Sequence, residues 1–290
     1  MSSTAVRLLM TSEKQVERWA STPLEPGLIR EGLISDPAAL GVKIKQCMEN
    51  SNIKGSKVIA SISGLYSIYR FLNVLQPDGQ SSKQAVMQAM TQAMPDSTEE
   101  FYLSWQRTDK DESNQQVFAI AMPKYLVDAE VQALVSGGVN PYVLNLKGMA
   151  LARLTDKQEA LIINIELDSI DIVLVANGIP QIMRTIPQKK NIPLEEWVEQ
   201  LIQNVDHIIY FYNTQHPRSP LNPAVPLFLT GQYADDPDLI YMVRDRIPYP
   251  TMPLTIPLEH PRNLPVNQYA VNIGLALKQT PVLQGIEDEQ

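Results

Sequence analysis

The sequence predicts an α/β protein, and two observations carry that prediction. Runs typical of β-strands alternate with amphipathic helices along the chain. In addition, Asn177-Gly178 separates two apolar runs, which indicates a β-hairpin because both residues tolerate the positive φ of a type I′ turn. With 44% hydrophobic and 19% charged residues, the 290-residue chain has enough apolar material for one or two packed cores.

The first half of the chain is predicted to open with strands and to carry an insertion. Ser35-Asp36-Pro37 supplies an N-cap and a first-turn proline for a helix. On a later helix, Ala85, Val86 and Met90 share one face, which favours core filling over a partner surface. The predicted elements are strands 4–10, 15–21, 57–62 and 67–75 with helix 37–50, then an α-β-β-α piece of helix 82–93, strands 100–108 and 116–122, and helix 123–136.

The second half is predicted to hold a meander followed by shorter elements. Trp197, Leu201, Val205 and Ile208 recur at helical spacing, which predicts a helix from Pro193 onward. The expected elements are an apolar segment 142–153, strands 160–167, 169–176 and 179–186, helix 193–213, strand 225–229, helix 237–244, an extended run 253–257 and helix 266–278.

Composition and charge exclude several classes of function. The formal net charge of -8 gives no basic footprint for nucleic acid. No apolar run approaches the roughly 20 residues of a membrane span, and no signal-peptide core is evident, so we expect no direct membrane insertion. The single cysteine, Cys47, suits a reducing cytoplasm.

No motif for catalysis or metal binding is found. His207, His216 and His260 share no metal-ligand spacing, so we expect no metal site. Ser63-Gly64 lacks the glycine two residues before the serine that a nucleophile elbow needs. The chain contains no phosphate-binding GxxxxGK[ST] motif, and Gly137-Gly138 is better explained as the end of a helix. No catalytic residue is therefore assigned.

Several segments, in chain order, resemble PilM-like type IV pilus assembly proteins, which belong to the FtsA/PilM branch of the actin-like ATPase superfamily. Each segment is short, but together they run collinearly over the chain. The matching segments are PGLIREGLISD at 26–36, helix 82–93 followed by Met94-Pro95 and Glu99-Glu100, GVNP at 138–141 with residues 146–153, and YAVNIGLALK at 269–278.

The resemblance implies an actin-like, ribonuclease H-like fold of two α/β lobes. It implies a first lobe of residues 1–75 plus 139–158, a small inserted α-β-β-α subdomain at 76–138, and a second lobe at 159–290. The terminal helix 266–278 would pack back near the lobe junction. Relatives begin with a strand that carries a D-x-G phosphate loop, and residues 2–7 resemble the segment just after that loop, so we expect the first strand to be missing here.

The resemblance also implies a function as a cytoplasmic scaffold of type IV pilus, or related secretion, machinery. Such proteins bind the N-terminal tail of a PilN-like inner-membrane protein and so lie peripheral to that membrane. A cleft between the insertion and the first lobe is the expected tail site, since an extended peptide can bury alternate side chains there. Its expected lining is Leu72, Val74, Tyr142 and Leu144, with core packing as the alternative for each one.

The nucleotide motifs depart from the family pattern. Relatives carry D-I-G where this chain has Asn164-Ile165-Glu166, and only one of their paired glycines is kept, at Gly231. A glycine lets backbone N–H groups approach phosphate, and glutamate removes that clearance. We therefore expect a degenerate nucleotide site and no required cofactor. Its residues are Asn164, Glu166, Ser169, Thr230, Gly231 and Gln232.

Two alternatives stay open from the sequence. The chain could be a functional actin-like ATPase that binds Mg-ATP, with Asp168 as the carboxylate if the alignment is shifted. An FtsA-like cell-division protein would carry a C-terminal amphipathic membrane helix, which residues 280–290 do not resemble.

Overall fold

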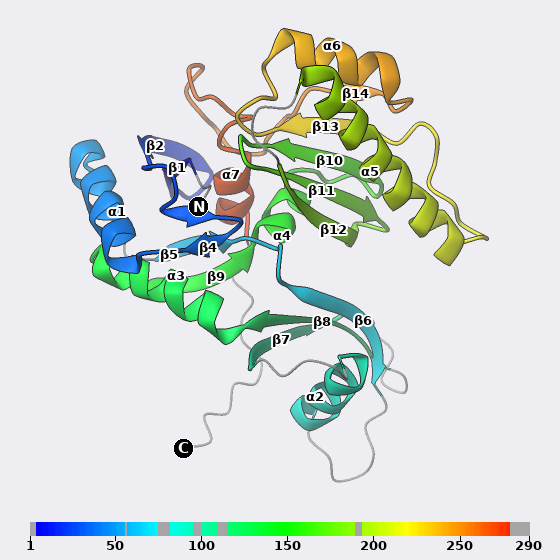
Figure 1. The fold of residues 1–290 in the computed structure, drawn as a ribbon, viewed down its shortest axis with the longest axis horizontal. Coiled ribbons are helices and arrows are strands. Elements are labelled where there is room, and N and C mark those ends of the chain that lie inside the picture. Colours follow the sequence, from blue (N-terminus) through cyan, green and yellow to red (C-terminus); the bar gives the residue numbers. More distant parts are fainter. Residues whose placement is uncertain are drawn as a thin grey trace.

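The computed structural model describes residues 4–55, 57–74, 82–94, 100–108, 115–188 and 193–278. It has two α/β lobes side by side and a smaller sheet below them (Figure 1). This is the actin-like, two-lobed arrangement that the sequence predicts. Some expectations fall outside the described residues: those at 2–3, Pro95, Glu99 and the tail 280–290.

The second lobe is built on a five-stranded sheet of order β12-β11-β10-β13-β14. Asn177 and Gly178 have φ of 55° and 70°, as the hairpin prediction requires. Strand β13 is parallel to β10, and its other edge pairs with β14. The strands are β10 (Ala160–Ile165), β11 (Ser169–Ala176), β12 (Ile179–Pro187), β13 (Leu227–Thr230) and β14 (Thr251–Met252).

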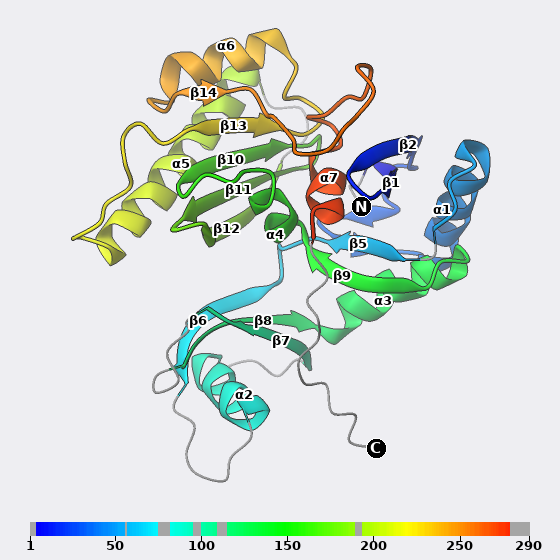
Figure 2. The same cartoon turned by 180° about the vertical axis from the view of Figure 1, so that it is seen from behind.

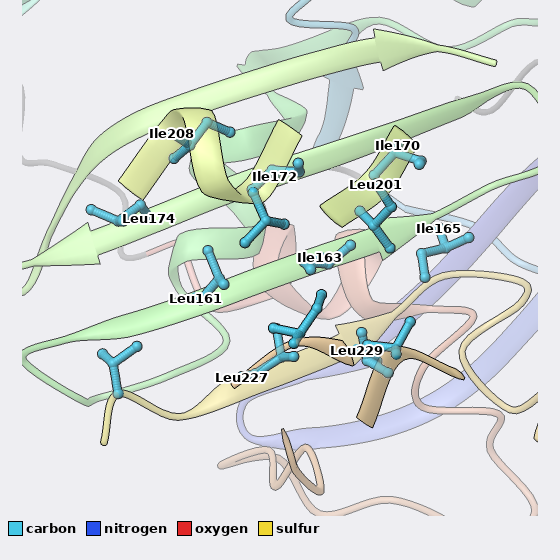
Figure 3. Close-up of a cluster of buried hydrophobic side chains, with 14 of the residues drawn as sticks. Leu161, Ile163, Ile165, Ile170, Ile172, Leu174, Leu201, Ile208, Leu227 and Leu229 are labelled. Atoms are coloured by element: carbon cyan, nitrogen blue, oxygen red, sulfur yellow. The ribbon is translucent and has the colours of Figure 1, made fainter. Parts of the chain in front are cut away.

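Helices cover both faces of this sheet, so its inner strands are mostly apolar. Successive residues of a strand point to opposite faces, and every residue of β10 is buried. One face packs against α5 (Leu194–Gln215) and α6 (Pro237–Arg246), where Leu161, Ile163 and Leu201 meet (Figure 3). The other face packs against α4 (Lys147–Ala152) and α7 (Ala270–Ala276), seen from behind in Figure 2.

In its described residues, the first lobe contains separate two-stranded sheets instead of one continuous sheet. Strands β1 (Ala5–Ser12) and β2 (Gln15–Pro23) form the predicted hairpin. Strands β5 (Val58–Ile62) and β9 (Pro141–Leu146) pair in parallel, and β3 (Ile29–Arg30) pairs with β4 (Leu33–Ile34). Helices α1 (Pro37–Ser51) and α3 (Lys124–Ser136) pack together on this lobe. The Asp36 side chain caps α1 by accepting from the Ala39 amide at 2.9 Å.

The small sheet has the order β6-β8-β7, with α2 (Ser82–Ala93) packed against it. Its strands are β6 (Ile68–Val74), β7 (Phe101–Arg107) and β8 (Gln115–Pro123). The predicted insertion spans 76–138, and the contacts of two elements cross these boundaries. Strand β6 belongs to it because it pairs with β8 over its whole length, whereas α3 packs on α1 of the first lobe.

Other elements differ in extent from the prediction. The segment 142–153 divides into β9 and α4. Helix α7 is shorter than 266–278, because residues 261–269 before it form turns. Strand β14 stops at Met252, where Pro253 follows and cannot donate a ladder hydrogen bond. No helix in the described part of the chain combines the length and apolar character needed to cross a bilayer.

Candidate functional site

The candidate site lies where β10 and β13 end side by side in the second lobe. Asn164 of β10 is paired in register with Thr230 of β13. The Thr230 hydroxyl donates to Asn164 Oδ1 at 3.2 Å, and both side chains are buried. Glu166 follows at the turn into β11, where its backbone N–H donates to the Ser169 carbonyl at 3.0 Å. Parallel pairing thus brings two residues that are 66 positions apart together at the carboxyl ends of neighbouring strands.

Glu166 forms a buried ion pair with Arg7 of β1. The Arg7 Nη1 donates to both carboxylate oxygens and Nη2 donates to Oε2, each at 3.0 Å. The side chains of Arg7 and Glu166 are only 8% and 2% exposed. Arg7 Nη2 also donates to Gln232 Oε1 at 3.4 Å. This bidentate geometry is the strong form of an ion pair, and it links the two lobes across the site.

A second buried network lies beside the first, centred on Asp171 of β11. Its Oδ2 is 2.8 Å from Lys147 Nζ and accepts from Asn164 Nδ2 at 3.1 Å. Its Oδ1 accepts from the Thr185 hydroxyl at 2.7 Å. Burial acts to lower the pKa of Lys147, but the charges of Asp171 and Glu166 outweigh burial and raise that pKa. Lys147 is therefore held as a cation within the site.

The six residues expected at the nucleotide site all lie near the carboxyl ends of β10 and β13. Asn164, Glu166, Thr230 and Gly231 are buried, Ser169 is half-buried and Gln232 is exposed. The single retained glycine has a structural reason. Gly231 has φ of 95°, and a Cβ on it would collide with the backbone of Ile165.

Sequence reasoning missed the partners of these residues: Arg7, Lys147, Asp171 and Thr185. For Asp171 a signal exists, because it is a lone carboxylate in the apolar run SIDIVLVA, and a buried charge needs a partner. Arg7 and Lys147 come from distant elements, and no local pattern predicts their pairing. The alternative carboxylate, Asp168, lies in the turn between β10 and β11, and its backbone carbonyl accepts from the Gln188 amide at 2.8 Å.

The four residues expected to line the tail site fall into two separate groups. Leu72 and Val74 pack in the small-sheet core with α2. Leu144 packs against the first-lobe core that contains Leu40 and Ile44. Tyr142 is 47% exposed at the start of β9, where Lys57 Nζ lies 5.5 Å from its ring centroid. The structure does not bring these two groups together in one hydrophobic cluster.

Metal ligands are not gathered in the part of the chain that the structure describes. There, no three His, Cys, Asp or Glu side chains are placed to share an ion. The carboxylates of Glu166 and Asp171 are instead bound to cationic side chains.

Comparison with known proteins identifies the fold. No family model and no curated protein matches the sequence. Among solved structures, a chain of the "PilM-PilN type IV pilus biogenesis complex" has a TM-score of 0.80 at 21% identity, covering 96% of both chains. The ethanolamine utilization protein EutJ from Carboxydothermus hydrogenoformans has a TM-score of 0.55 at 12% identity, covering 95% of this chain and 86% of that one. The cytoplasmic domain of EpsL, an inner-membrane component of the type II secretion system of Vibrio cholerae, gives 0.51 at 12%, covering 98% and 94%. The chain thus shares the fold of these proteins over nearly its whole length.

Proposed function

We propose that this chain is a scaffold of type IV pilus machinery that binds the N-terminal tail of a PilN-like inner-membrane protein. Support comes from the fold, which matches a chain of the PilM–PilN complex over 96% of both chains. The collinear sequence motifs point to the same family. In this proposal the protein is cytoplasmic, has no catalytic duty and reaches the inner membrane through its partner.

We further propose that the nucleotide site is degenerate, and the Arg7–Glu166 pair carries this proposal. In a nucleotide-binding member of the fold, cationic and backbone N–H groups at such an edge would face phosphate oxygens. Here the Arg7 guanidinium is bound to Glu166 in bidentate fashion. A triphosphate would have to displace a buried carboxylate and would meet its negative charge. Like charges about 4 Å apart cost roughly 4 kcal/mol at an effective dielectric of 20, which is nearly three decades of affinity.

Equilibrium dialysis with Mg-ATP tests this proposal. We expect the unmutated protein either not to bind Mg-ATP or to bind it with a dissociation constant above about 10 μM. Glu166→Gly should improve binding at least about tenfold, because it removes the carboxylate, frees Arg7 and lets the backbone approach phosphate. Glu166→Gln is the matched control, since it removes the charge but keeps the bulk, and it should gain less. A wild-type dissociation constant below about 10 μM would favour the alternative, a functional actin-like ATP-binding protein.

Calorimetric titration with a PilN-like tail peptide from the same organism tests the partner. Tyr142 suits mutation because it is exposed, so removing its ring leaves the core intact. The ring also lies beside the basic side chain of Lys57. We expect Tyr142→Ala to weaken binding about tenfold or more, as the truncation of an aromatic anchor does. Tyr241→Ala is the control, because Tyr241 is 73% exposed on the second lobe.

The expected role of Leu72 needs a second measurement. Leu72→Asp should abolish tail binding if Leu72 lines the site, but it also places a charge against the α2 core. Its melting curve must therefore be compared with that of the unmutated protein. Unchanged affinity in both Tyr142→Ala and a folded Leu72→Asp variant would remove this location.

A further inference from the structure

Strand β7 forms an outer edge of the small sheet. Among the described residues it pairs with β8 on one side, and the sheet ends there, since its order is β6-β8-β7. Both views show β7 at the border of the small sheet (Figures 1 and 2). The strand has seven residues, FYLSWQR, and its ladder with β8 runs without a bulge. It therefore presents a straight edge of unpaired backbone groups.

The hydrogen bonds at the two ends of β7 show which of its residues face outward. The Lys124 amide donates to the Glu100 carbonyl at 2.8 Å, and the Thr108 amide donates to the Gln116 carbonyl at 2.9 Å. Backbone groups of an antiparallel strand alternate between its two edges, so the even-numbered residues of β7 bond to β8. The N–H and C=O groups that point outward belong to the odd-numbered residues, which are Phe101, Leu103, Trp105 and Arg107.

The sequence of β7 does not block pairing at this edge. Charges, prolines and short strands are the usual means of keeping strand edges apart. Other outer strands of the described chain have them: β6 carries the exposed Arg70 near its centre, β12 contains Pro180 and Pro187, and β14 has only two residues. Strand β7 has no proline, and its only charged residue, Arg107, is the last one.

The apolar side chains of β7 are incompletely covered. Phe101, Leu103 and Trp105 pack against the core beneath α2, yet each is only half-buried. Helix α2 packs on β6 and β8, so β7 lies at the margin of the area that this helix covers. A further strand beside β7 would cover these side chains, and apolar residues on the same face of that strand would suit them.

We propose that a second copy of this chain docks on this edge, so that two β7 strands pair antiparallel about a twofold axis and join two three-stranded sheets into one. Outward-facing residues must form the hydrogen-bonded pairs. When Ser104 lies opposite Ser104 of the other copy, all seven residues overlap. Leu103 then pairs with Trp105, and Phe101 with Arg107, which makes about eight hydrogen bonds in four pairs.

The side chains of β7 are complementary to themselves in this register. Leu103 of each copy meets Trp105 of the other, and apolar cross-strand pairs of this kind stabilise antiparallel sheets. Arg107 meets the ring of Phe101, which attracts a cation. Like charges do not face each other, because Arg107 lies at the end of the strand. This self-complementarity identifies the occupant as a second copy, and a twofold contact closes the assembly at two chains.

Sedimentation of the full chain between about 1 and about 500 μM measures the association. One pair of strands is a small interface, so we expect a reversible dimer with a micromolar dissociation constant. Ser104→Lys should weaken it at least about tenfold, because Ser104 is exposed and two lysines would face each other across the axis. Asn73→Lys is the matched control. Asn73 is exposed on β6, at the opposite edge of the same sheet, so this change should leave the association intact.

A charge-swap mixture shows whether residue 104 faces its own copy. Ser104→Glu alone should also weaken the dimer, but an equimolar mixture of S104K and S104E should associate, because unlike charges then face each other. Hydrogen exchange gives a readout that needs no variant. The outward amides of Leu103 and Trp105 should become protected as protein concentration rises, whereas the Ser104 amide, bonded to β8, should be protected at every concentration.

Three results would overturn the proposal. One is a chain that stays monomeric over this concentration range. Another is a dimer that Ser104→Lys leaves intact, or one whose concentration-dependent protection lies outside β7. The third is a monomer in which the amides of Leu103 and Trp105 are protected only when a PilN-like tail peptide is added, since that result would assign the edge to a different partner.

Discussion

Buried charges at the candidate site are paired between residues that lie far apart in the chain. Arg7 and Glu166 are separated by 159 positions. Sequence reasoning named Asn164 and Glu166 because they depart from a local motif, and the structure gathers them at one edge. It could not name Arg7 or Lys147, because long-range pairing leaves no trace in local periodicity. Met90 shows the opposite case, since helical spacing alone predicted a core residue and it is 1% exposed.

Tyr269 provides a prediction about pH at the scale of one residue. Burial raises its pKa to about 12, and the nearby Arg7 only partly opposes this. The folded state therefore favours the neutral phenol, whose pKa is about 10 when unfolded. The corresponding stability is fully present below about pH 10 and is lost as the pH rises toward 12, at up to about 1.4 kcal/mol per pH unit.

Urea unfolding of the wild type and Tyr269→Phe between about pH 8 and pH 11 measures this effect. The free energy of unfolding should fall less steeply above about pH 10 in Tyr269→Phe. The variant keeps some slope, because the pKa of Lys147 is also raised and its ion pair with Asp171 is lost at high pH. Identical pH profiles for the two proteins would contradict the assignment to Tyr269.

Elements with local signals were predicted well, and elements fixed by tertiary pairing were not. The Asn177-Gly178 hairpin and the Asp36 cap depend on nearby residues, and both occur as expected. The sequence placed strand β6 with the first lobe, because its run of residues does not reveal that its partner is β8. Helix α3 was placed with the insertion for the same reason, since only the packed structure shows its contact with α1.

The crossing of α7 over α4 gives a prediction at the scale of elements. A Cβ on Gly274 would overlap the backbone carbonyl of Ala150, so the two helices meet backbone to backbone. Alanine favours a helix by about 1 kcal/mol over glycine, but overpacking costs about 1 to 3 kcal/mol or more. The clash should dominate, and Gly274→Ala should lower the free energy of unfolding.

Gly55→Ala is the matched control for this substitution. Among the described residues its Cβ would meet only Val58 Cγ2, at 3.8 Å, so the substitution should change the free energy of unfolding by less than about 0.5 kcal/mol. Chemical denaturation compares the two variants with the wild type. A Gly274→Ala protein as stable as the wild type would show that α7 shifts away from α4 without cost.

At the scale of the whole molecule, polar contacts between distant residues join the two lobes and the small sheet. The Tyr69 hydroxyl of β6 donates to the Met183 carbonyl at 3.0 Å and accepts from its amide at 2.7 Å, which ties the small sheet to the second lobe. The Arg7–Glu166 pair and the Asn272–Arg7 hydrogen bond join β1 to the second lobe and to α7. The two-lobed fold was predictable through family resemblance, but these junctions were not, because no local pattern marks residues so far apart in the chain.

The Arg7–Glu166 pair should therefore control how firmly the lobes are joined. Removing one member leaves a buried charge without a partner, which costs about 3 to 5 kcal/mol, whereas replacing both with apolar residues is often nearly neutral. We expect Arg7→Met and Glu166→Leu each to be strongly destabilising and the double variant to recover most of the loss. A double-mutant cycle from urea unfolding measures the coupling, expected at about 2 kcal/mol or more.

Salt separates a buried pair from an exposed one in the same experiment. Salt weakens the attraction between exposed charges, with a screening length of about 10 Å at 0.1 M. The side chains of Arg7 and Glu166 are only 8% and 2% exposed, so salt should weaken their attraction much less. The coupling should therefore persist from about 0.05 to about 1 M sodium chloride. If it were below about 0.5 kcal/mol, or disappeared at high salt, the pair would behave as a surface contact. The lobes would then depend on their other contacts, among them the packing of α4 against α7 and the Asn272–Arg7 hydrogen bond, and Glu166 would present no lasting obstacle to a phosphate.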